Sequence, residues 1–478
     1  MKKTKIFNCL VLSILALSFA KAQNISFEDA NFKALLLSAS PSNGIARDAS
    51  GYAVAIDTNN DGEISYEEVL NVYRLGSFDS PFMADIVSMK EIQYFTNLTS
   101  LSGVLPSLES LDLSKNINLQ TMEVDNTQIE TLDLSKNINL KNLSLRGNPN
   151  LKTIDISENV NLTGLDLSIV NSINSGIETL DVSKNINLTS LNLTGCTKIG
   201  TLDVSKNINL QYLFLDNTNI ETLDVSKNIS LQNLELGYNN KIETLDVSKN
   251  INLSWLYLGS SSMIKTIDVS KNINLQMLDL DNTGIETLDV SKNINLQSLI
   301  LDNTSIETLD VSSNLNLVGL YIQGCTALTS LYMKNGVSKT FDNNYNFQGT
   351  DLKSICCDED EIATVKDYMQ NLATNDLLAA GWQASDLVVG ANCENLGTED
   401  LSLQQAKATL YPNPVKDVLY FSTSGKVAKA EIYDLNGRLI KTSAVSSNSV
   451  NVSDLANGLY FIVLETDKGV VKEKFIKN

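Results

Sequence analysis

The chain has 478 residues, a formal net charge of −20 and no histidine. The length allows several domains, and the acidity disfavours binding to nucleic acid or to anionic membrane surfaces. Because histidine is absent, Ser-His-Asp and Cys-His catalysis and histidine-ligated zinc or iron sites are excluded. We therefore expect a protein that is not an enzyme.

Residues 1–22 have the pattern of a secretory signal peptide. A lysine-containing start precedes an apolar stretch from Leu10 to Ala20, and Ala20-Lys21-Ala22 forms a small-residue cleavage site. No other apolar stretch is long enough to span a bilayer. The sequence therefore predicts a secreted protein without a transmembrane segment.

Residues 23–95 are expected to form a helical N-terminal cap. Ser26, with Asp29 three residues later, predicts a capping box at the start of a helix that continues through Phe32 and Leu36.

A calcium-binding loop is predicted within this cap, at residues 57–68. The segment Asp-Thr-Asn-Asn-Asp-Gly-Glu-Ile-Ser-Tyr-Glu-Glu matches the EF-hand pattern, and Gly62 permits the sharp turn. A helix from Tyr66 to Leu75 is expected to follow, whereas the preceding segment is not clearly helical, so the loop is EF-hand-like and unpaired. The alternative is an Asx-rich turn without a metal. The predicted calcium ligands are Asp57, Asn59, Asp61, Glu63 through its carbonyl oxygen, Ser65 and Glu68.

Residues 96–335 repeat a phrase close to Leu-Asp-Val-Ser-Lys-Asn-Ile-Asn-Leu, most often every 21 or 22 residues. A fixed period of this size indicates a solenoid, in which each repeat contacts only its neighbours. Each repeat contains a constant half (Leu-Asp-Val-Ser) and a variable half, and we expect both to form short strands on opposite walls. The nested L-x-x-L-x-L-x-x-N-x-L pattern resembles the leucine-rich repeat family, in particular its bacterial 21-residue variety. The resemblance implies a mainly β solenoid, and a longer half-repeat at residues 168–176 predicts a local bulge.

The asparagines of the repeated Ser-Lys-Asn are predicted to be structural. Each lies at the turn after a strand, where its side chain can hydrogen-bond the backbone of its own and adjacent coils. The expected asparagine ladder consists of Asn116, Asn137, Asn185, Asn207, Asn228, Asn250, Asn272 and Asn293.

The outward residue of the constant half is nearly always aspartate. We interpret these residues as a solvated face whose charges prevent edge association. The alternative is a calcium- or sugar-binding acidic face, as in parallel β-helix polysaccharide lyases. The aspartates are Asp133, Asp181, Asp203, Asp224, Asp246, Asp268, Asp289 and Asp310.

The outward residues of the variable half include a column of large apolar groups, which predicts an interaction surface for a protein partner. The alternative is that loops or the C-terminal cap cover these rings, or that they are scattered and without a role. The predicted partner-binding residues are Tyr212, Phe214, Trp255, Tyr257, Met277, Ile300 and Tyr321.

Residues 336–394 are expected to close the solenoid. Residues 358–371 predict a helix with acids in its first turn. Secretion favours a disulfide between Cys393 and either Cys356 or Cys357, and the sequence leaves that choice open. A zinc site at these cysteines would lack a fourth soft ligand. Separately, Cys196 and Cys325 are too far apart to bridge and are predicted to be buried thiols.

A polar linker at residues 395–408 precedes a tail of short alternating runs, residues 409–478, which predicts a β-sandwich. Asn436-Gly437 is a strong hairpin signal. Tyr411-Pro412-Asn413-Pro414 and the closing Lys474-Phe475-Ile476-Lys477 resemble the type A sorting domain of type IX secretion. This resemblance implies export by the type IX machinery to the surface of a Gram-negative cell, with anchoring or release. A small carbohydrate-binding sandwich is the alternative.

The sequence therefore predicts a secreted or cell-surface solenoid protein for non-catalytic protein recognition or adhesion. The alternative is a polysaccharide-binding or calcium-dependent polysaccharide-degrading solenoid, for which glycans would be the ligands.

Overall fold

The computed structural model divides the chain into two compact units, Met1–Gly397 and Thr398–Asn478. The signal peptide predicted at residues 1–22 lies outside the described residues and stays a prediction. Within the part of the chain that the structure describes, no helix is long and apolar enough to cross a membrane. The structure describes residues 23–76, 82–83, 85–169, 176–337, 344–393, 408–423, 426–433, 439–444, 448–466 and 469–478.

The N-terminal region consists of short helices and strands. They are α2 (Ala30–Leu37), β1 (Ala46–Arg47), β2 (Ala53–Val54), α3 (Tyr66–Val69), β3 (Arg74–Leu75), β4 (Phe82–Met83) and the 3-10 helix η1 (Lys90–Tyr94). Strand β1 pairs antiparallel with β2 and β3, and β3 pairs parallel with β5 (Ser100–Val104). The N-terminal region therefore extends the sheet of the solenoid and covers its first coil.

Helix α2 begins directly after Asp29, so the cap predicted at Ser26 is wrong. The Asp29 Oδ1 atom accepts the amides of Asn31 (2.8 Å) and Phe32 (3.0 Å), while Oδ2 accepts the amide of Val87 (2.7 Å). One carboxylate thus caps the helix and also binds a segment 58 residues later in the chain.

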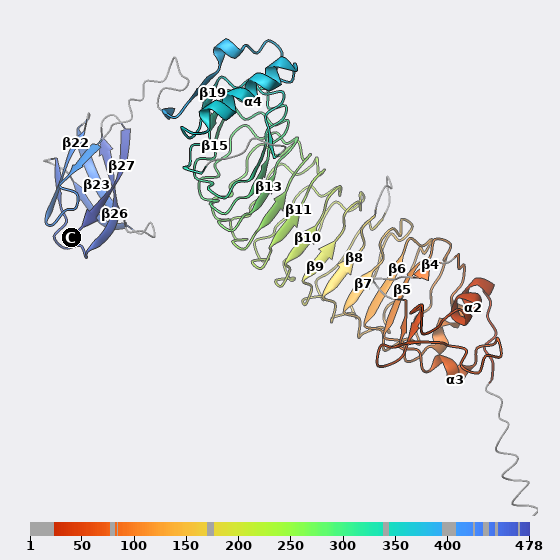
Figure 1. The fold of residues 1–478 in the computed structure, drawn as a ribbon. Helices are drawn as coiled ribbons and strands as arrows, with labels where there is room; N and C mark the ends of the chain where they lie inside the picture. The colour runs from red at the N-terminus through yellow and green to blue at the C-terminus, as the bar shows by residue number, and fades with distance from the viewer. Residues whose placement is uncertain are drawn as a thin grey trace, which may run out of the picture. The chain divides into compact units, whose positions relative to one another are not determined.

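The solenoid places one short strand of each variable half on a single wall (Figure 1). These strands run parallel and in register, so that Leu213, Leu234 and Leu256 lie in one fully buried column. The expected bulge at residues 168–176 falls mostly on residues 170–175, outside the described residues. The strands after β5 are β6 (Thr121–Asp125), β7 (Asn142–Ser144), β8 (Gly164–Asp166), β9 (Ser190–Asn192), β10 (Tyr212–Phe214), β11 (Asn233–Glu235), β12 (Trp255–Tyr257), β13 (Met277–Asp279), β14 (Ser298–Ile300), β16 (Gly319–Tyr321) and β18 (Tyr345–Asn346).

The predicted asparagine ladder is confirmed, and it contains two further members. Each Nδ2 atom donates to two carbonyl oxygens of the preceding coil at 2.8–3.1 Å. All of these side chains are completely buried. The additional members are Asn159 and Asn314, which follow Ser-Glu and Ser-Ser in place of Ser-Lys.

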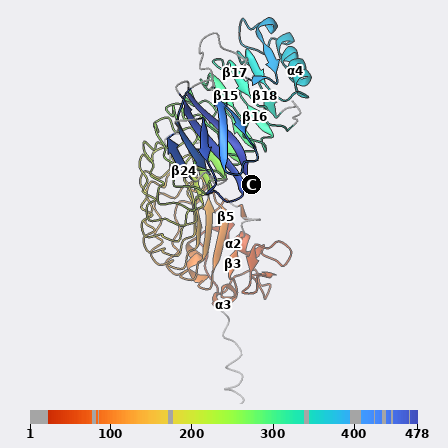
Figure 2. The ribbon, with the colours of Figure 1, turned by 90° about the vertical axis from the view of Figure 1, so that its left-hand side faces the viewer.

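The prediction of a second strand in every coil is wrong, because constant halves form a strand ladder only near the C-terminal end of the described solenoid. There, β15 (Thr308–Asp310), β17 (Ser330–Tyr332), β19 (Ser354–Cys356) and β20 (Val388–Gly390) form a four-stranded sheet. In earlier coils the side chain of each ladder asparagine after Asn116 donates a hydrogen bond to a carbonyl oxygen in the constant half of the preceding coil. Asn228 Nδ2, for example, donates to Val204 O at 3.0 Å. Asn314 is the last member of the ladder. Strand pairing of the constant halves begins in the same coil, at β15. Figure 2 shows the strand-free side of the preceding coils as loops.

The C-terminal cap contains α4 (Ile362–Thr374) and the 3-10 helix η2 (Ala384–Asp386). Helix α4 begins four residues later than predicted, so the acids from residue 358 precede it. The Asp358 carboxylate accepts the amides of Asn335 (3.0 Å) and Gly336 (2.8 Å), which ties the end of the solenoid to the cap.

The cysteines follow the prediction and settle the choice that the sequence left open. Cys356 pairs with Cys393, with Cα atoms 5.3 Å apart, whereas Cys357 is buried outside this disulfide. Cys196 and Cys325 are buried thiols, as expected.

The second compact unit consists of two antiparallel sheets with a common core. One sheet has the order β21-β22-β25 and the other β24-β23-β26-β27. Phe421 from the first sheet and Ile462 and Phe475 from the second are buried in one cluster, so the predicted sandwich is confirmed. The Asn436-Gly437 turn lies outside the described residues. The strands are β21 (Ala408–Tyr411), β22 (Val418–Thr423), β23 (Val427–Tyr433), β24 (Leu439–Ala444), β25 (Ser449–Asn451), β26 (Gly458–Thr466) and β27 (Gly469–Lys477).

Candidate functional site

The seven predicted partner-binding residues all lie on the strand wall and point away from the core. Trp255 is 42% exposed, whereas its neighbours Leu256 and Leu258 are completely buried. The predicted alternation of inward and outward side chains is therefore confirmed, and the binding role stays a prediction. Tyr212 and Phe214 lie on β10, Trp255 and Tyr257 on β12, Met277 on β13, Ile300 on β14 and Tyr321 on β16.

Four of the five aromatic residues in this set occur as pairs, on β10 and β12. The rings of Tyr212 and Phe214 stack on β10 with centroids 6.5 Å apart. On β12, Trp255 and Tyr257 meet edge to face at 6.3 Å. The strand β11 between them carries the smaller Asn233, so two aromatic pairs flank a strand with no ring.

The outward residues align in rows that run across the strands. One row contains Phe214, Glu235, Tyr257, Asp279 and Ile300, because the strands pair in register. We call this the Glu235 row. It alternates aromatic and acidic side chains over four consecutive strands.

A second row lies two residues further along each coil and adds acids that the sequence analysis did not single out. It contains Asp216, Gly237, Gly259, Asp281 and Asp302. The Asp216 Oδ1 atom accepts the amide of Gly237 at 2.6 Å. A Cβ atom on Gly259 would collide with the Asp281 carboxylate, so this glycine leaves the space that the carboxylate occupies.

Crowding among these carboxyl groups changes their titration. Burial, together with a hydrogen bond and the charge of Asp216, raises the pKa of Glu235 to about 7. Burial and the nearby charge of Asp281 likewise raise the pKa of Asp279 to about 7. Burial also raises the pKa of Tyr257, with further contributions from the charges of Glu235 and Asp279. This part of the wall therefore holds negative charges at unfavourably short separation.

The aspartates of the constant half have a different environment. Each accepts the amide of the serine two residues later through Oδ1, at 2.8–2.9 Å. The amide of Ser248 lowers the pKa of Asp246 in this way, and the pKa is lowered by the same kind of contact at Asp133, Asp181, Asp203, Asp224, Asp268 and Asp289. These contacts give the aspartates a role in the turn, which fits the interpretation of a solvated face.

The predicted calcium loop forms a tight turn at Gly62, which has φ +77°. The Asp57 Oδ2 atom accepts the amide of Gly62 (3.0 Å), and the Asp61 Oδ1 atom accepts the amide of Glu63 (2.9 Å). The Glu63 carboxylate pairs with Lys33 Nζ at 2.7 Å, which leaves its backbone carbonyl as the predicted ligand.

Two of the predicted calcium ligands, Ser65 and Glu68, form a capping box at the start of α3. The Glu68 Oε1 atom accepts the amide of Thr58 (2.8 Å), and Oε2 accepts the amide of Ser65 (2.9 Å). Although burial acts to raise it, these hydrogen bonds leave the pKa of Glu68 below its usual value. Helix α3 ends at Val69, so the longer helix predicted to Leu75 is wrong.

The donor set of the loop suits calcium, because it consists of oxygen atoms and includes three carboxylates. The carboxylates are not gathered, however: among the described residues no three His, Cys, Asp or Glu side chains lie close enough together to hold a metal ion. Calcium binding thus stays a prediction.

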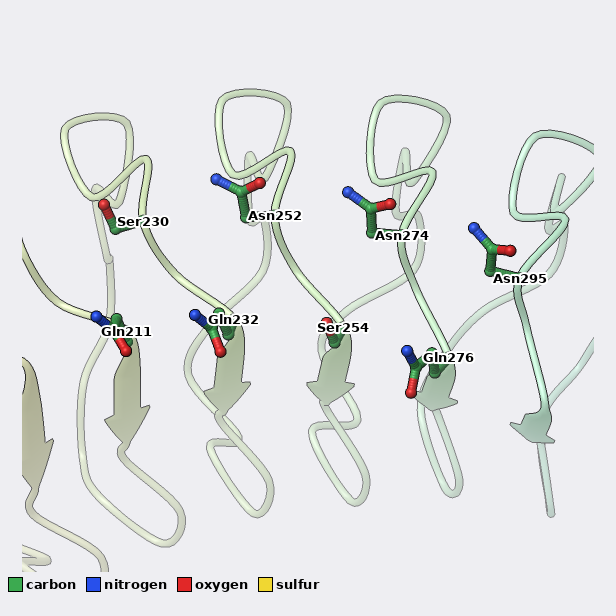
Figure 3. Close-up of a pocket in the computed structure, with 8 residues that line it drawn as sticks. All are labelled: Gln211, Ser230, Gln232, Asn252, Ser254, Asn274, Gln276 and Asn295. Atoms are coloured by element: carbon green, nitrogen blue, oxygen red, sulfur yellow. The ribbon is translucent and has the colours of Figure 1, made fainter.

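A polar groove of about 660 Å³ borders the start of the strands (Figure 3). A similar groove adjoins it along earlier coils and shares Gln211 and Ser230 with it. The asparagines hold their orientation through the backbone; Asn252 Nδ2, for example, binds Ile229 O at 3.0 Å. We call this the amide groove. In the sequence it could be recognised by the polar residue that precedes each strand of the variable half. It is lined by Gln211, Ser230, Gln232, Asn252, Ser254, Asn274, Gln276 and Asn295.

An exposed aliphatic column beside the amide groove also escaped the sequence analysis. Each member follows a ladder asparagine and is 45–57% exposed. In the sequence, this column could be recognised by the isoleucine that lies between two asparagines in the repeated phrase. The column consists of Ile117, Ile138, Val160, Ile186, Ile208, Ile229, Ile251, Ile273, Ile294 and Leu315.

Comparisons with known proteins agree with both parts of the architecture. The model of the secretion system C-terminal sorting domain matches residues 409–478. The solved functional domain of InlJ from Listeria monocytogenes matches with a TM-score of 0.52 and 20% sequence identity, over 95% of this chain and 100% of that chain. At that identity the similarity shows the fold alone, which is a leucine-rich repeat solenoid.

Two further solved structures are similar over part of the chain. A leucine-rich repeat protein from Leptospira interrogans has a TM-score of 0.49 and 18% identity, over 68% of this chain and 91% of that chain. An internalin from Listeria monocytogenes has a TM-score of 0.43 and 20% identity, over 61% of this chain and 97% of that chain. No curated protein sequence matches the chain.

Proposed function

We propose that this chain, a leucine-rich repeat solenoid with a C-terminal sorting domain, is secreted, recognises a protein partner without catalysis and serves in adhesion. The observation that supports this proposal is the alignment of seven large apolar and aromatic side chains on one wall. Exposed aromatic residues in a connected patch are typical anchors of protein interfaces. The wall is rigid because its strands are paired in register. Binding therefore loses little conformational entropy of the backbone.

The double variant W255A/Y257A should keep its far-ultraviolet circular dichroism and nearly its melting temperature, because both side chains lie outside the core. We expect its adhesion to the surface that the wild-type protein binds to fall at least about tenfold, since interface aromatics commonly contribute 2 kcal/mol or more. Adhesion is measured with the purified full chain on immobilised host or bacterial cells. The matched control is Y52A, which removes a tyrosine that is 74% exposed in the N-terminal region. Unchanged adhesion of W255A/Y257A would contradict the proposal.

We further propose that residues 409–478 direct the chain through the type IX machinery to the outer surface of a Gram-negative bacterium. Deletion of these residues should abolish export, so that the protein accumulates inside the cell and is lost from the surface and medium. Immunoblots of cell fractions measure the distribution. The control is a fusion of residues 1–408 with the C-terminal sorting domain of another exported protein. This fusion should restore export. Normal secretion of the truncated chain would contradict this role.

We also propose that calcium binds the loop of residues 57–68 and stabilises the N-terminal cap. Asp57, Asn59, Asp61, the Glu63 carbonyl, Ser65 and Glu68 would hold the ion, and Glu68 would exchange some of its present hydrogen bonds for it. At about 10 mM calcium a site with the affinity of extracellular modules would add about 1–3 kcal/mol to the free energy of unfolding. Thermal melting of the full chain with calcium, and with chelator, measures this difference.

The double variant D57N/D61N should lose the calcium-dependent rise in melting temperature, while D48N, in the same region, should keep it. Magnesium at equal ionic strength controls for general screening of charge. Absence of calcium uptake in titration calorimetry would end this proposal.

A polysaccharide ligand is the second candidate, and the amide groove supports it. Rows of amide and hydroxyl groups at a regular spacing of about 4.8 Å suit a polymer rich in hydroxyl groups. A glycan array probed with the full chain tests this candidate, because only strong binding to extended oligosaccharides would favour it over a protein partner.

A further inference from the structure

The Glu235 row combines two features that together suit a cation. Glu235 lies between two aromatic side chains, because Phe214 and Tyr257 are its registered neighbours on either side. Adjacent strands are about 4.8 Å apart, so the two aromatic strands are about 10 Å apart. A flat group placed above Glu235 would therefore have a ring on each side and a carboxylate beneath it.

Positive charge is missing from this part of the wall. Five consecutive coils, at residues 211–219, 232–240, 254–262, 276–284 and 297–305, contain five acids and no lysine or arginine. The acids are Asp216, Glu235, Asp279, Asp281 and Asp302. Because like charges at short range repel, a cationic partner would relieve the crowding of these carboxylates.

An earlier coil shows how this wall accommodates such a partner. In the row that contains Asp216, the Asp125 Oδ2 atom accepts both Nε (3.0 Å) and Nη2 (2.8 Å) of Arg146 on the adjacent coil. Two N–H groups of the planar guanidinium thus converge on one oxygen of the carboxylate. Of the five coils described above, three carry an aspartate at this position of the row (Asp216, Asp281 and Asp302), and none carries an arginine.

We propose that the Glu235 row binds an arginine-bearing basic segment of the partner protein, with a guanidinium group between Phe214 and Tyr257 and against the carboxylate of Glu235. This inference rests on the proposed function and specifies the chemistry of its partner. Arginine is favoured over lysine because the guanidinium group stacks on aromatic faces and binds a carboxylate through two hydrogen bonds.

The test is titration calorimetry of the full chain with hexa-arginine, blocked at both ends, at pH 8, where both carboxyl groups with a pKa of about 7 are mostly ionised. Hexa-arginine should bind, more weakly as salt rises, and at least about threefold more tightly than hexa-lysine. E235Q should weaken the binding about tenfold, and Y257A about three- to tenfold. Hexa-glutamate should not bind.

The matched controls are D246N, which removes an equal charge from the constant half, and Y52A. Both should bind hexa-arginine like the wild type, and circular dichroism verifies that all variants are folded. The inference is overturned if hexa-arginine does not bind, or if D246N weakens binding as much as E235Q, which would indicate general attraction to an acidic protein.

The two proposals fail in different ways. If hexa-arginine binding does not depend on Glu235 while W255A/Y257A still loses adhesion, the wall recognises a protein by other contacts and only the present inference is wrong. If W255A/Y257A adheres normally, the proposed function itself is wrong, whatever hexa-arginine does.

Discussion

Leu256→Ala should lower the free energy of unfolding by about 2–5 kcal/mol, the usual range for a buried leucine that leaves a cavity. Leu256 is completely buried in the column of strand leucines. Trp255→Ala, one residue earlier, should cost only about 0.5–1 kcal/mol although it removes more atoms, because Trp255 lies on the exposed side of β12. Urea unfolding of the full chain followed by circular dichroism measures both variants.

The comparison of these two neighbours tests the register of the wall directly. A shift of one residue would exchange the inward and outward sets on every strand. If the tryptophan variant were the less stable of the two, the proposed interaction surface would lie inside the core. Because solenoid repeats couple to their neighbours, the loss in L256A should also appear as faster amide exchange in the adjacent coils.

Asn250→Ala is the second substitution with a large expected effect. The Asn250 Nδ2 atom binds Val225 O (3.0 Å) and Asn228 O (2.9 Å), and the variant leaves these carbonyl groups without that donor in a buried environment. Each lost partner costs about 1–3 kcal/mol, so we expect a total of about 2–6 kcal/mol. Unfolding in urea, by the same signal, measures the loss.

The control lies two residues away in the same coil. Asn252 is exposed and donates a single hydrogen bond to Ile229 O at 3.0 Å, so Asn252→Ala should cost less than about 1 kcal/mol. Equal effects of the two substitutions would mean that the buried ladder contributes no more than a surface hydrogen bond.

The features that could be predicted from the sequence are those that depend on local periodicity. The strand wall and its alternation follow from the L-x-L pattern, because inward leucines at a period of two must face the core. The ladder also follows from the repeat. Asn159 and Asn314 were missed because the prediction relied on the neighbouring lysine, although their distance from the flanking leucines is the same as in the other coils.

The features that could not be predicted depend on contacts between distant segments or on competition for one donor or acceptor. Asp29 caps α2 because its carboxylate also reaches Val87. In most coils the constant halves form no strand ladder among the described residues, and there asparagine side chains bind the nearby carbonyl groups. Ser65 and Glu68 match two patterns, a calcium loop and a capping box, and the sequence offers no means of choosing between them.

The candidate site was predicted in part. Its apolar members were found because they occupy alternate positions of a strand. Asp216, Asp281 and Asp302 were not found, because they lie after the strand, where alternation no longer applies. Each of these acids lies two residues after the last residue of its strand. This pattern can be recognised only when the sequences of neighbouring coils are aligned.

The asparagine ladder has a consequence for how such a chain can change over time. Its side chains bind backbone atoms of the preceding coil, which every coil possesses, and not a particular side chain. A unit of 21 or 22 residues could therefore be duplicated or lost by recombination without creating a mismatched joint. Outward residues could then diverge one coil at a time, so that the protein acquires new ligands while its scaffold is inherited unchanged.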